Sequence, residues 1–162
     1  MLLPRLVVAQ AAPVAAAFRD NAAEQAKNLV AAAELMPADK YSFKPTPAQM
    51  TFGDIVMHLS GGNDYFCGLL GDVKPPTRAK LAPTAPKEAL VTRLKETFQF
   101  CTDALAKLDD SKLGEKVTLS FMPQPVTRAA LMTITTGDWA DHYSQSAIYL
   151  RLNGVLPPTA KK

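Results

Sequence analysis

The distribution of proline constrains this chain of 162 residues more than any other feature of its sequence. The 13 prolines leave four long proline-free windows, at residues 14–36, 48–74, 87–122 and 126–156. Proline lacks a backbone N–H and clashes with the preceding helical turn, so it interrupts the interior of a helix. Because each window has room for a helix of several turns, the proline positions predict four helices.

Apolar side chains recur at intervals of three and four within these windows, as they do on the buried face of a helix. The third window shows the pattern most clearly, at Leu90, Leu94, Phe98, Cys101, Leu105 and Leu108. We therefore expect an all-α chain in which residues 13–158 form a single four-helix bundle. Residues 159–162 are expected to be a flexible tail.

Residues that begin and end helices lie near the expected boundaries. Thr51 followed by Asp54 resembles a capping box, and Thr127 is a suitable N-cap for the fourth helix. Gly154, shortly before a pair of prolines, is typical of a helix stop. Between the third and fourth helices we expect a loop that contains a short strand at residues 117–121.

The composition excludes several classes of function. Hydrophobic residues make up 48% of the chain and charged residues 20%, which is typical of a globular protein. The formal net charge is only +3 and the basic residues are scattered, so we expect no nucleic-acid partner. The apolar runs are far shorter than the roughly 18–20 residues that span a bilayer, so we expect no membrane partner.

Residues 1–12 have two interpretations, a disordered N-terminus or the remnant of an export signal. The apolar run at residues 6–8 precedes Ala9-Gln10-Ala11, which has the A-x-A form of a signal-peptidase site. Pro4 interrupts the apolar stretch, however, and no basic region precedes it. We favour the remnant slightly, and with it an exported or periplasmic location over a cytoplasmic one.

The chain has two cysteines, Cys67 in the second window and Cys101 in the third. Two buried free thiols are expected of a cytosolic protein, whereas an exported protein favours a disulfide that joins the second and third helices. We favour the disulfide because of the pattern at residues 9–11. The cysteines do not form a C-x-x-C motif, so a catalytic role for either thiol is not supported.

The inward stripe of the fourth helix is polar in its middle. Steps of three and four from Leu131 reach Thr135, Asp138, His142, Gln145, Tyr149 and Leu152. Asp138 and His142 are one turn apart and share a helix face, which is the spacing by which helical side chains chelate a metal.

His58, in the second helix and close to its apolar stripe, is the only other histidine. If both stripes face the bundle centre, His58, Asp138 and His142 form a set of two imidazoles and one carboxylate with open coordination positions. Such a set suits zinc, nickel or iron better than calcium, which prefers oxygen ligands.

These polar residues also have simpler interpretations. Asp138 and His142 could form a solvated face or a structural salt bridge, and His58 could be a core histidine with its hydrogen bonds satisfied. Gly61 and Gly62, one turn after His58, indicate close packing, space for a ligand or a helix kink. The spacing alone leaves these alternatives open.

Two segments resemble a known family. Residues 138–158, which include His142, Gln145 and Arg151, resemble the last helix of DinB-like, YfiT-like proteins. Residues 41–45, with Thr51-Phe52-Gly53 and His58, resemble the segment that leads into the second helix of the same proteins. The resemblance extends over residues 14–158, nearly the whole chain.

The resemblance implies a four-helix bundle with up-down-down-up topology and a homodimer. It also implies a divalent transition metal, bound by one histidine of the second helix and two of the fourth. His58 and His142 match two of these positions, and Gln145 matches a glutamine near the metal that we expect to orient a ligand. Asp138 replaces the remaining histidine, so the metal site is either preserved as a two-His-one-Asp variant or lost.

The function implied by the resemblance is that of a metal-dependent enzyme acting on a small molecule. The metal, zinc or nickel, would activate a thiolate or a water, with a low-molecular-weight thiol as a candidate substrate. The resemblance leaves open whether such an enzyme is a transferase or a hydrolase. The alternative is a catalytically silent bundle that binds a ligand or a partner through a degenerate metal site.

Overall fold

The computed structural model describes residues 12–160, and its framework is four helices. These are α1 (Pro13–Leu35), α2 (Phe52–Gly71), α3 (Lys87–Leu105) and α4 (Arg128–Leu152). Two 3-10 turns (Ala38–Lys40 and Asp110–Lys112) and two short strands, β1 (Lys116–Val117) and β2 (Val126–Thr127), lie in the connections. The predicted all-α four-helix bundle is thereby confirmed. The proposed signal remnant, apart from residue 12, lies outside the described residues.

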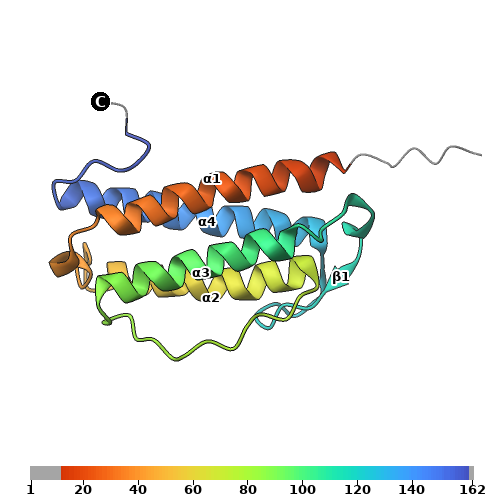
Figure 1. Cartoon of the computed structure of the whole chain (residues 1–162), viewed down its shortest axis with the longest axis horizontal. Coiled ribbons are helices and arrows are strands. Elements are labelled where there is room, and N and C mark those ends of the chain that lie inside the picture. Colours follow the sequence, from red (N-terminus) through yellow and green to blue (C-terminus); the bar gives the residue numbers. More distant parts are fainter. Residues whose placement is uncertain (1–11, 161–162) are drawn as a thin grey trace, which may run out of the picture.

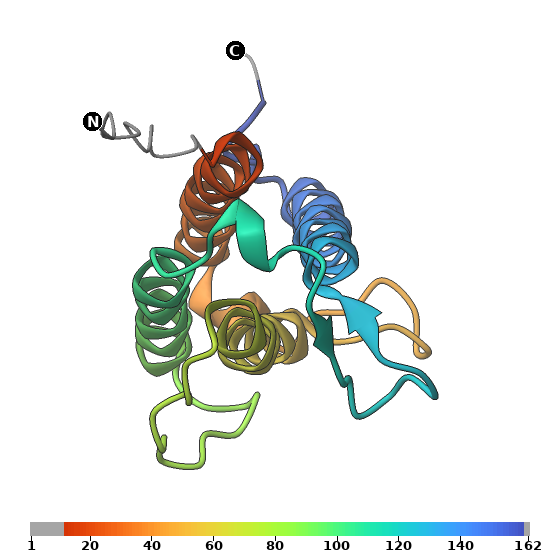
Figure 2. The ribbon, with the colours of Figure 1, turned by 90° about the vertical axis from the view of Figure 1, so that its right-hand side faces the viewer.

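The four helices enclose a common core. Viewed along its long axis, the bundle has the helices at four corners in the cyclic order α1, α4, α2 and α3 (Figure 2). The sequence colours run in one direction along α1 and α4 and in the opposite direction along α2 and α3 (Figure 1). The long connection between α2 and α3 returns the chain along the outside of the bundle, and α2 and α4 lie side by side.

The helix ends form where the sequence indicates. The Thr51 side chain accepts a hydrogen bond from the backbone N–H of Asp54, whose carboxylate accepts one from the Thr51 N–H, which confirms the capping box. Thr127 caps α4 by accepting from the N–H of Ala130 at 3.1 Å. At the other end of α4, Gly154 has φ +73°, a left-handed conformation that glycine adopts without strain.

The connection between α3 and α4 differs from the expected single strand at residues 117–121. The α3 helix ends at Leu105, and the following segment forms a two-stranded antiparallel hairpin in which Lys116 pairs with Thr127 and Val117 with Val126. A strand needs a hydrogen-bonded partner, and the pairing with β2 includes only Lys116 and Val117, whereas residues 118–121 form no strand. The prediction was therefore wrong in its length and bounds.

The core follows the predicted stripes closely in α3 and less closely in α4. All six positions of the third stripe are buried, including Leu108, which lies beyond the helix end. In α4, Leu152 is exposed although the stripe predicted it to be buried. The buried seam of α4 instead runs through Leu131, Thr135, Trp139, His142, Ser146, Tyr149 and Leu150.

Hydrogen bonds join α2 to α4 at both ends of the pair. The buried Arg128, at the start of α4, donates to the backbone carbonyls of Leu69 and Leu70 at the end of α2. Near the other end, the Tyr149 hydroxyl donates to the Met50 carbonyl at 2.9 Å, and burial raises the pKa of this hydroxyl. These bonds fix how far α4 is shifted along α2, and therefore which of their residues face each other.

A disulfide joins α2 to α3. Cys67 and Cys101 are bonded in the structure, with their Cα atoms 5.0 Å apart, and both residues are buried. The pairing is the one favoured from the sequence. Within residues 12–160, the helices lack the combination of length and hydropathy that a membrane crossing requires.

Candidate metal centre

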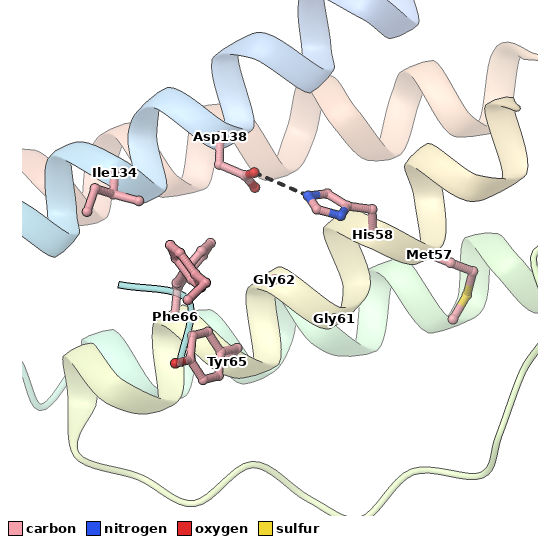
Figure 3. A pocket seen from close by; sticks show the side chains of 9 residues that line it. Met57, His58, Gly61, Gly62, Tyr65, Phe66, Ile134 and Asp138 are labelled. Atoms are coloured by element: carbon pink, nitrogen blue, oxygen red, sulfur yellow. Dashed lines mark hydrogen bonds and ion pairs between the residues drawn. The ribbon is translucent and has the colours of Figure 1, made fainter. Parts of the chain in front are cut away.

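His58, Asp138 and His142 meet between α2 and α4. The Nε2 atom of His58 lies 3.4 Å from Asp138 Oδ1, and the Nδ1 atom of His142 lies 3.5 Å from the same oxygen. One potential ligand atom from each residue lies within 4.8 Å of the others. Figure 3 shows the Asp138 carboxylate directed from α4 toward the His58 ring on α2.

A backbone hydrogen bond orients the His142 ring. Its Nδ1 atom lies 2.7 Å from the carbonyl oxygen of Asp138, one turn earlier in α4. A carbonyl oxygen only accepts hydrogen bonds, so Nδ1 carries the proton. In the neutral imidazole, the lone pair is then on Nε2, which is the state of a metal-binding histidine whose other nitrogen donates to a carbonyl.

The three side chains differ in exposure. The side chain of His142 is 9% exposed and that of Asp138 is 17% exposed, whereas His58 is 50% exposed at the surface. The rings of the two histidines stack with centroids 4.6 Å apart and planes 25° from parallel. His142 and Asp138 are thus mostly enclosed by surrounding residues, whereas His58 lies where the site opens to solvent.

The distances fit a divalent transition metal. With zinc–nitrogen and zinc–oxygen bonds of about 2.0–2.2 Å, adjacent ligand atoms of a tetrahedral site lie about 3.4 Å apart. The distance of 3.4 Å between His58 Nε2 and Asp138 Oδ1 has this separation, whereas the 3.5 Å contact of Asp138 joins it to His142 Nδ1, which is not the ligand atom. The widest separation in the group, 4.8 Å, requires a modest closing movement, for which the exposed His58 side chain has space.

A cavity of about 580 Å³ opens directly beside this group, and His58 and Asp138 form part of its lining. Its remaining lining is mostly apolar and includes Phe66 of α2 and Ile134 of α4 (Figure 3). A mostly apolar cavity with a few convergent polar groups is the usual form of a small-molecule site. His58 and Asp138 are therefore accessible to a molecule bound in the cavity.

The structure does not place Gln145 with the candidate ligands. Among the described residues, its amide donates to the exposed Asp141 carboxylate at 2.7 Å, one turn away on the outer side of α4. The expectation that Gln145 orients a ligand therefore has no support in this geometry. The buried face of α4 is rotated relative to the predicted stripe. It passes through Trp139, His142 and Ser146, so Gln145 lies at its edge.

Buried residues beside the site were not predicted from the sequence. The indole N–H of Trp139 donates to Asn63 Oδ1 at 2.8 Å, and the amide of Asn63 donates to Thr97 at 3.2 Å. Trp139 and Asn63 directly follow Asp138 and Gly62, so this bond holds α2 and α4 together at the level of the candidate ligands. A sequence signal for these residues existed in Trp139, the only tryptophan of the chain. It is buried in the core although it comes one position after Asp138, which the predicted stripe contained instead.

Comparison with known families gives one match that covers most of the chain. The model of the DinB superfamily matches residues 22–146, which include all three candidate ligands. None of the curated proteins compared with the chain matches it.

Solved structures with the same fold share little sequence with this chain. A DinB-like protein from Bacillus subtilis is 18% identical, with a TM-score of 0.71, and the alignment covers 90% of this chain and 99% of that one. A DinB-like protein from Bacillus cereus ATCC 10987 is 13% identical, with a TM-score of 0.73 and coverages of 89% and 95%. A conserved protein from Enterococcus faecalis is 16% identical, with a TM-score of 0.68 and coverages of 86% and 96%.

Proposed function

The chain belongs to the DinB superfamily, and on this basis we propose that it is a metal-dependent enzyme that acts on a small molecule. His58, Asp138 and His142 would hold the metal, zinc or nickel, as a two-His-one-Asp variant of the site that the family resemblance implies. A metal bound by three protein ligands keeps an open position and lowers the pKa of a water or thiol bound there. The reaction would then be a hydrolysis or a thiol transfer.

In this proposal, hydrogen bonds within the chain orient the side chains that would bind the metal. The hydrogen bond from His142 Nδ1 to the Asp138 carbonyl would present Nε2 to the metal, and the Asp138 carboxylate contacts one nitrogen of each imidazole. The adjacent cavity of about 580 Å³ would bind the substrate next to the open position.

One observation carries the proposal. Three side chains of metal-binding type, two from one turn of α4 and one from α2, 80 residues earlier than Asp138, converge to within 4.8 Å, and His58 and Asp138 line a cavity. The contact of Asp138 with His142 follows from their spacing on one helix, but the approach of His58, the only other histidine of the chain, adds little stability by itself, because a partly exposed ion pair contributes only about 0–1 kcal/mol.

The test is elemental analysis of the full chain after incubation with Zn²⁺ or Ni²⁺ and dialysis. We expect about one equivalent of metal in the parent protein and loss of that metal in Asp138→Ala and His142→Ala. Asp138→His, which introduces the histidine that the family resemblance implies, should retain it. Asp141→Ala is the matched control, because Asp141 is an exposed aspartate of the same helix that pairs with Gln145.

The alternative function is a catalytically silent bundle that binds a ligand in the cavity without a metal. The observation that favours this alternative is the pair of contacts that Asp138 makes with the two histidines, at 3.4 and 3.5 Å. Through these contacts the carboxylate can be stabilised without a metal. A parent protein that binds neither metal after dialysis would contradict the metal-dependent function and support this alternative.

A further inference from the structure

Two rows of α2 residues line the cavity, and each row has a glycine at its centre. Residues four apart lie one above the other on the same face of a helix. The two rows are Met57, Gly61 and Tyr65, and His58, Gly62 and Phe66. Large side chains at both ends and glycines in the middle make this face of α2 concave (Figure 3).

The glycines leave space instead of allowing close helix packing. A Cβ atom added at Gly61 would have no other heavy atom within 4 Å. One added at Gly62 would lie 3.6 Å from Asp138 Oδ2 and 3.7 Å from the Phe66 ring, which is ordinary contact. Of the interpretations open at the sequence level, the geometry therefore favours space for a ligand.

Aromatic rings form one end of the cavity. The ring centroids of Tyr65 and Phe66 are 5.5 Å apart, and Phe121 lies 6.2 Å from Phe66 and 6.4 Å from Tyr65. Phe121 belongs to the loop between β1 and β2 and is 61% exposed. The Tyr65 hydroxyl accepts from the N–H of Ser120 at 2.7 Å, so the loop that carries Phe121 is joined to α2.

The described residues that line the cavity include no lysine or arginine, and Asp138 is their only carboxylate. An anionic group on a ligand would lose its hydration there without gaining a cationic partner. A metal that coordinates one functional group of a ligand leaves any further carboxylate or phosphate of that ligand unpaired. The cavity is thus poorly suited to low-molecular-weight thiols that carry several charges.

We propose that the substrate is an uncharged small molecule with an aromatic or similar apolar ring. The ring packs against Tyr65, Phe66 and Phe121, over the hollow at Gly61 and Gly62, and a polar donor atom of the same molecule reaches the metal. The volume of about 580 Å³ suits a molecule with a single ring system. The metal contact rests on the proposed function, whereas the ring site does not.

The test uses three probes that share one metal-binding group. They are acetohydroxamic acid, benzohydroxamic acid and 4-carboxybenzohydroxamic acid, titrated into the Zn²⁺-loaded full chain and followed by amide chemical shifts. Benzohydroxamic acid should bind at least about tenfold more tightly than acetohydroxamic acid, because its ring gains apolar and aromatic contacts. The carboxylate of the third probe should weaken binding again by about tenfold.

A matched pair of variants localises the ring. Gly61→Leu places a side chain in the cavity, whereas Gly137→Leu adds the same side chain to α4 outside it, and an added Cβ has no neighbour within 4 Å at either position. We expect Gly61→Leu to abolish the preference for benzohydroxamic acid and to leave Zn²⁺ affinity unchanged. Gly137→Leu should bind all three probes as the parent does.

The outcomes separate this inference from the proposed function. If Zn²⁺ binds but the three probes bind equally, or the carboxylated probe binds most tightly, the ring site is overturned and the metal site stands. If Zn²⁺ does not bind, the proposed function fails, and benzyl alcohol is titrated into the metal-free chain instead. Shifts of the amides of residues 61–66 that are absent in Gly61→Leu then support the ring site, and their absence in the parent overturns it.

Discussion

Asn63 is the buried polar residue that joins the two helices of the candidate site. It is completely buried, and its amide is used in both directions, accepting from Trp139 and donating to Thr97. A buried polar group stabilises a fold only when it is hydrogen-bonded, and the loss of its partner leaves the remaining donor unsatisfied. Trp139 therefore depends on Asn63 for the only hydrogen bond that its indole makes within the described residues.

We predict that Asn63→Ala lowers the free energy of unfolding by about 2–4 kcal/mol. The variant leaves the Trp139 N–H without an acceptor and creates a small cavity. Urea unfolding followed by tryptophan fluorescence measures the effect, because Trp139 is the only tryptophan. Asn28→Ala is the control, since Asn28 bonds the nearby Glu24 at the surface and its substitution should change stability by less than about 0.5 kcal/mol. Equal effects of the two substitutions would contradict this account of Asn63.

At the scale of single residues, the sequence predicted that His58, Asp138 and His142 lie close together, but not all of their surroundings. His58, Asp138 and His142 were identified because histidine and aspartate are unusual on an inward stripe. Gln145 was assigned to the same stripe because steps of three and four from Leu131 allow two paths along a helix. The observed seam follows the other path, through Trp139 and Ser146, and only packing against neighbouring helices selects between them.

Packing of α2 against α3 depends on a close approach of their backbones at Gly71. A Cβ atom added at Gly71 would overlap the carbonyl group of Ala104, so a side chain can enter only if the helices separate. The disulfide between Cys67 and Cys101 lies one turn earlier and joins the same two helices.

We predict opposite effects for the same substitution at two glycines of α2. Gly71→Ala should destabilise the protein by about 1–3 kcal/mol because the two helices would be overpacked. Gly61→Ala should stabilise it by up to about 1 kcal/mol, because alanine favours the helix and the added Cβ has free space. Urea unfolding of both variants measures this difference. A stabilising effect of Gly71→Ala would contradict the close approach.

Reduction of the disulfide should lower the free energy of unfolding by about 3–4 kcal/mol, since the bond closes a loop between positions 34 residues apart. The measurement compares urea unfolding of the parent with and without dithiothreitol, after the free thiols of the reduced sample have been counted. A Cys67→Ala, Cys101→Ala double variant is the control and should not respond to the reductant. An unchanged midpoint in the fully reduced parent would show that the bond adds no stability.

The elements themselves were predictable because proline and capping residues act locally. Three of the proline-free windows gave helices that fill most of their length, and Thr51 and Thr127 mark observed starts. The window at residues 87–122 was misleading, because its helix ends at Leu105 without a proline. The hairpin that follows depends on pairing with residues 126–127, a contact that no local signal specifies.

At the scale of the whole molecule, the candidate site depends on the relative position of α2 and α4. Arg128 joins one end of this pair and Tyr149 the other, and Trp139 joins the middle. His58 and Asp138 are 80 residues apart in sequence and meet because these bonds fix the register. A metal held across the two helices would therefore stabilise the folded bundle as a unit.

We predict that Zn²⁺ raises the melting temperature of the metal-free protein. A free concentration 100 times the dissociation constant adds about 2.7 kcal/mol to stability, which corresponds to roughly 5–10 °C for a chain of this length. Differential scanning calorimetry with and without Zn²⁺ measures the shift. Asp138→Ala should show no shift and Asp141→Ala the full one, and a shift of equal size in both variants would indicate binding elsewhere.

The cavity could be predicted from the sequence only in part. Gly61 and Gly62 indicated open space among other interpretations, but Phe121 reaches the cavity from a loop whose position depends on the hairpin and on the bond between Tyr65 and Ser120. The ring site is therefore a property of the assembled molecule, whereas the candidate ligands could be identified from helical spacing.

The most direct test of the central claim is an anomalous difference map from crystals grown with Zn²⁺, recorded at the zinc absorption edge. The account predicts one strong peak among His58, Asp138 and His142, about 2.0–2.2 Å from an atom of each side chain. A map with no peak there, or with zinc bound only at other side chains, would contradict it.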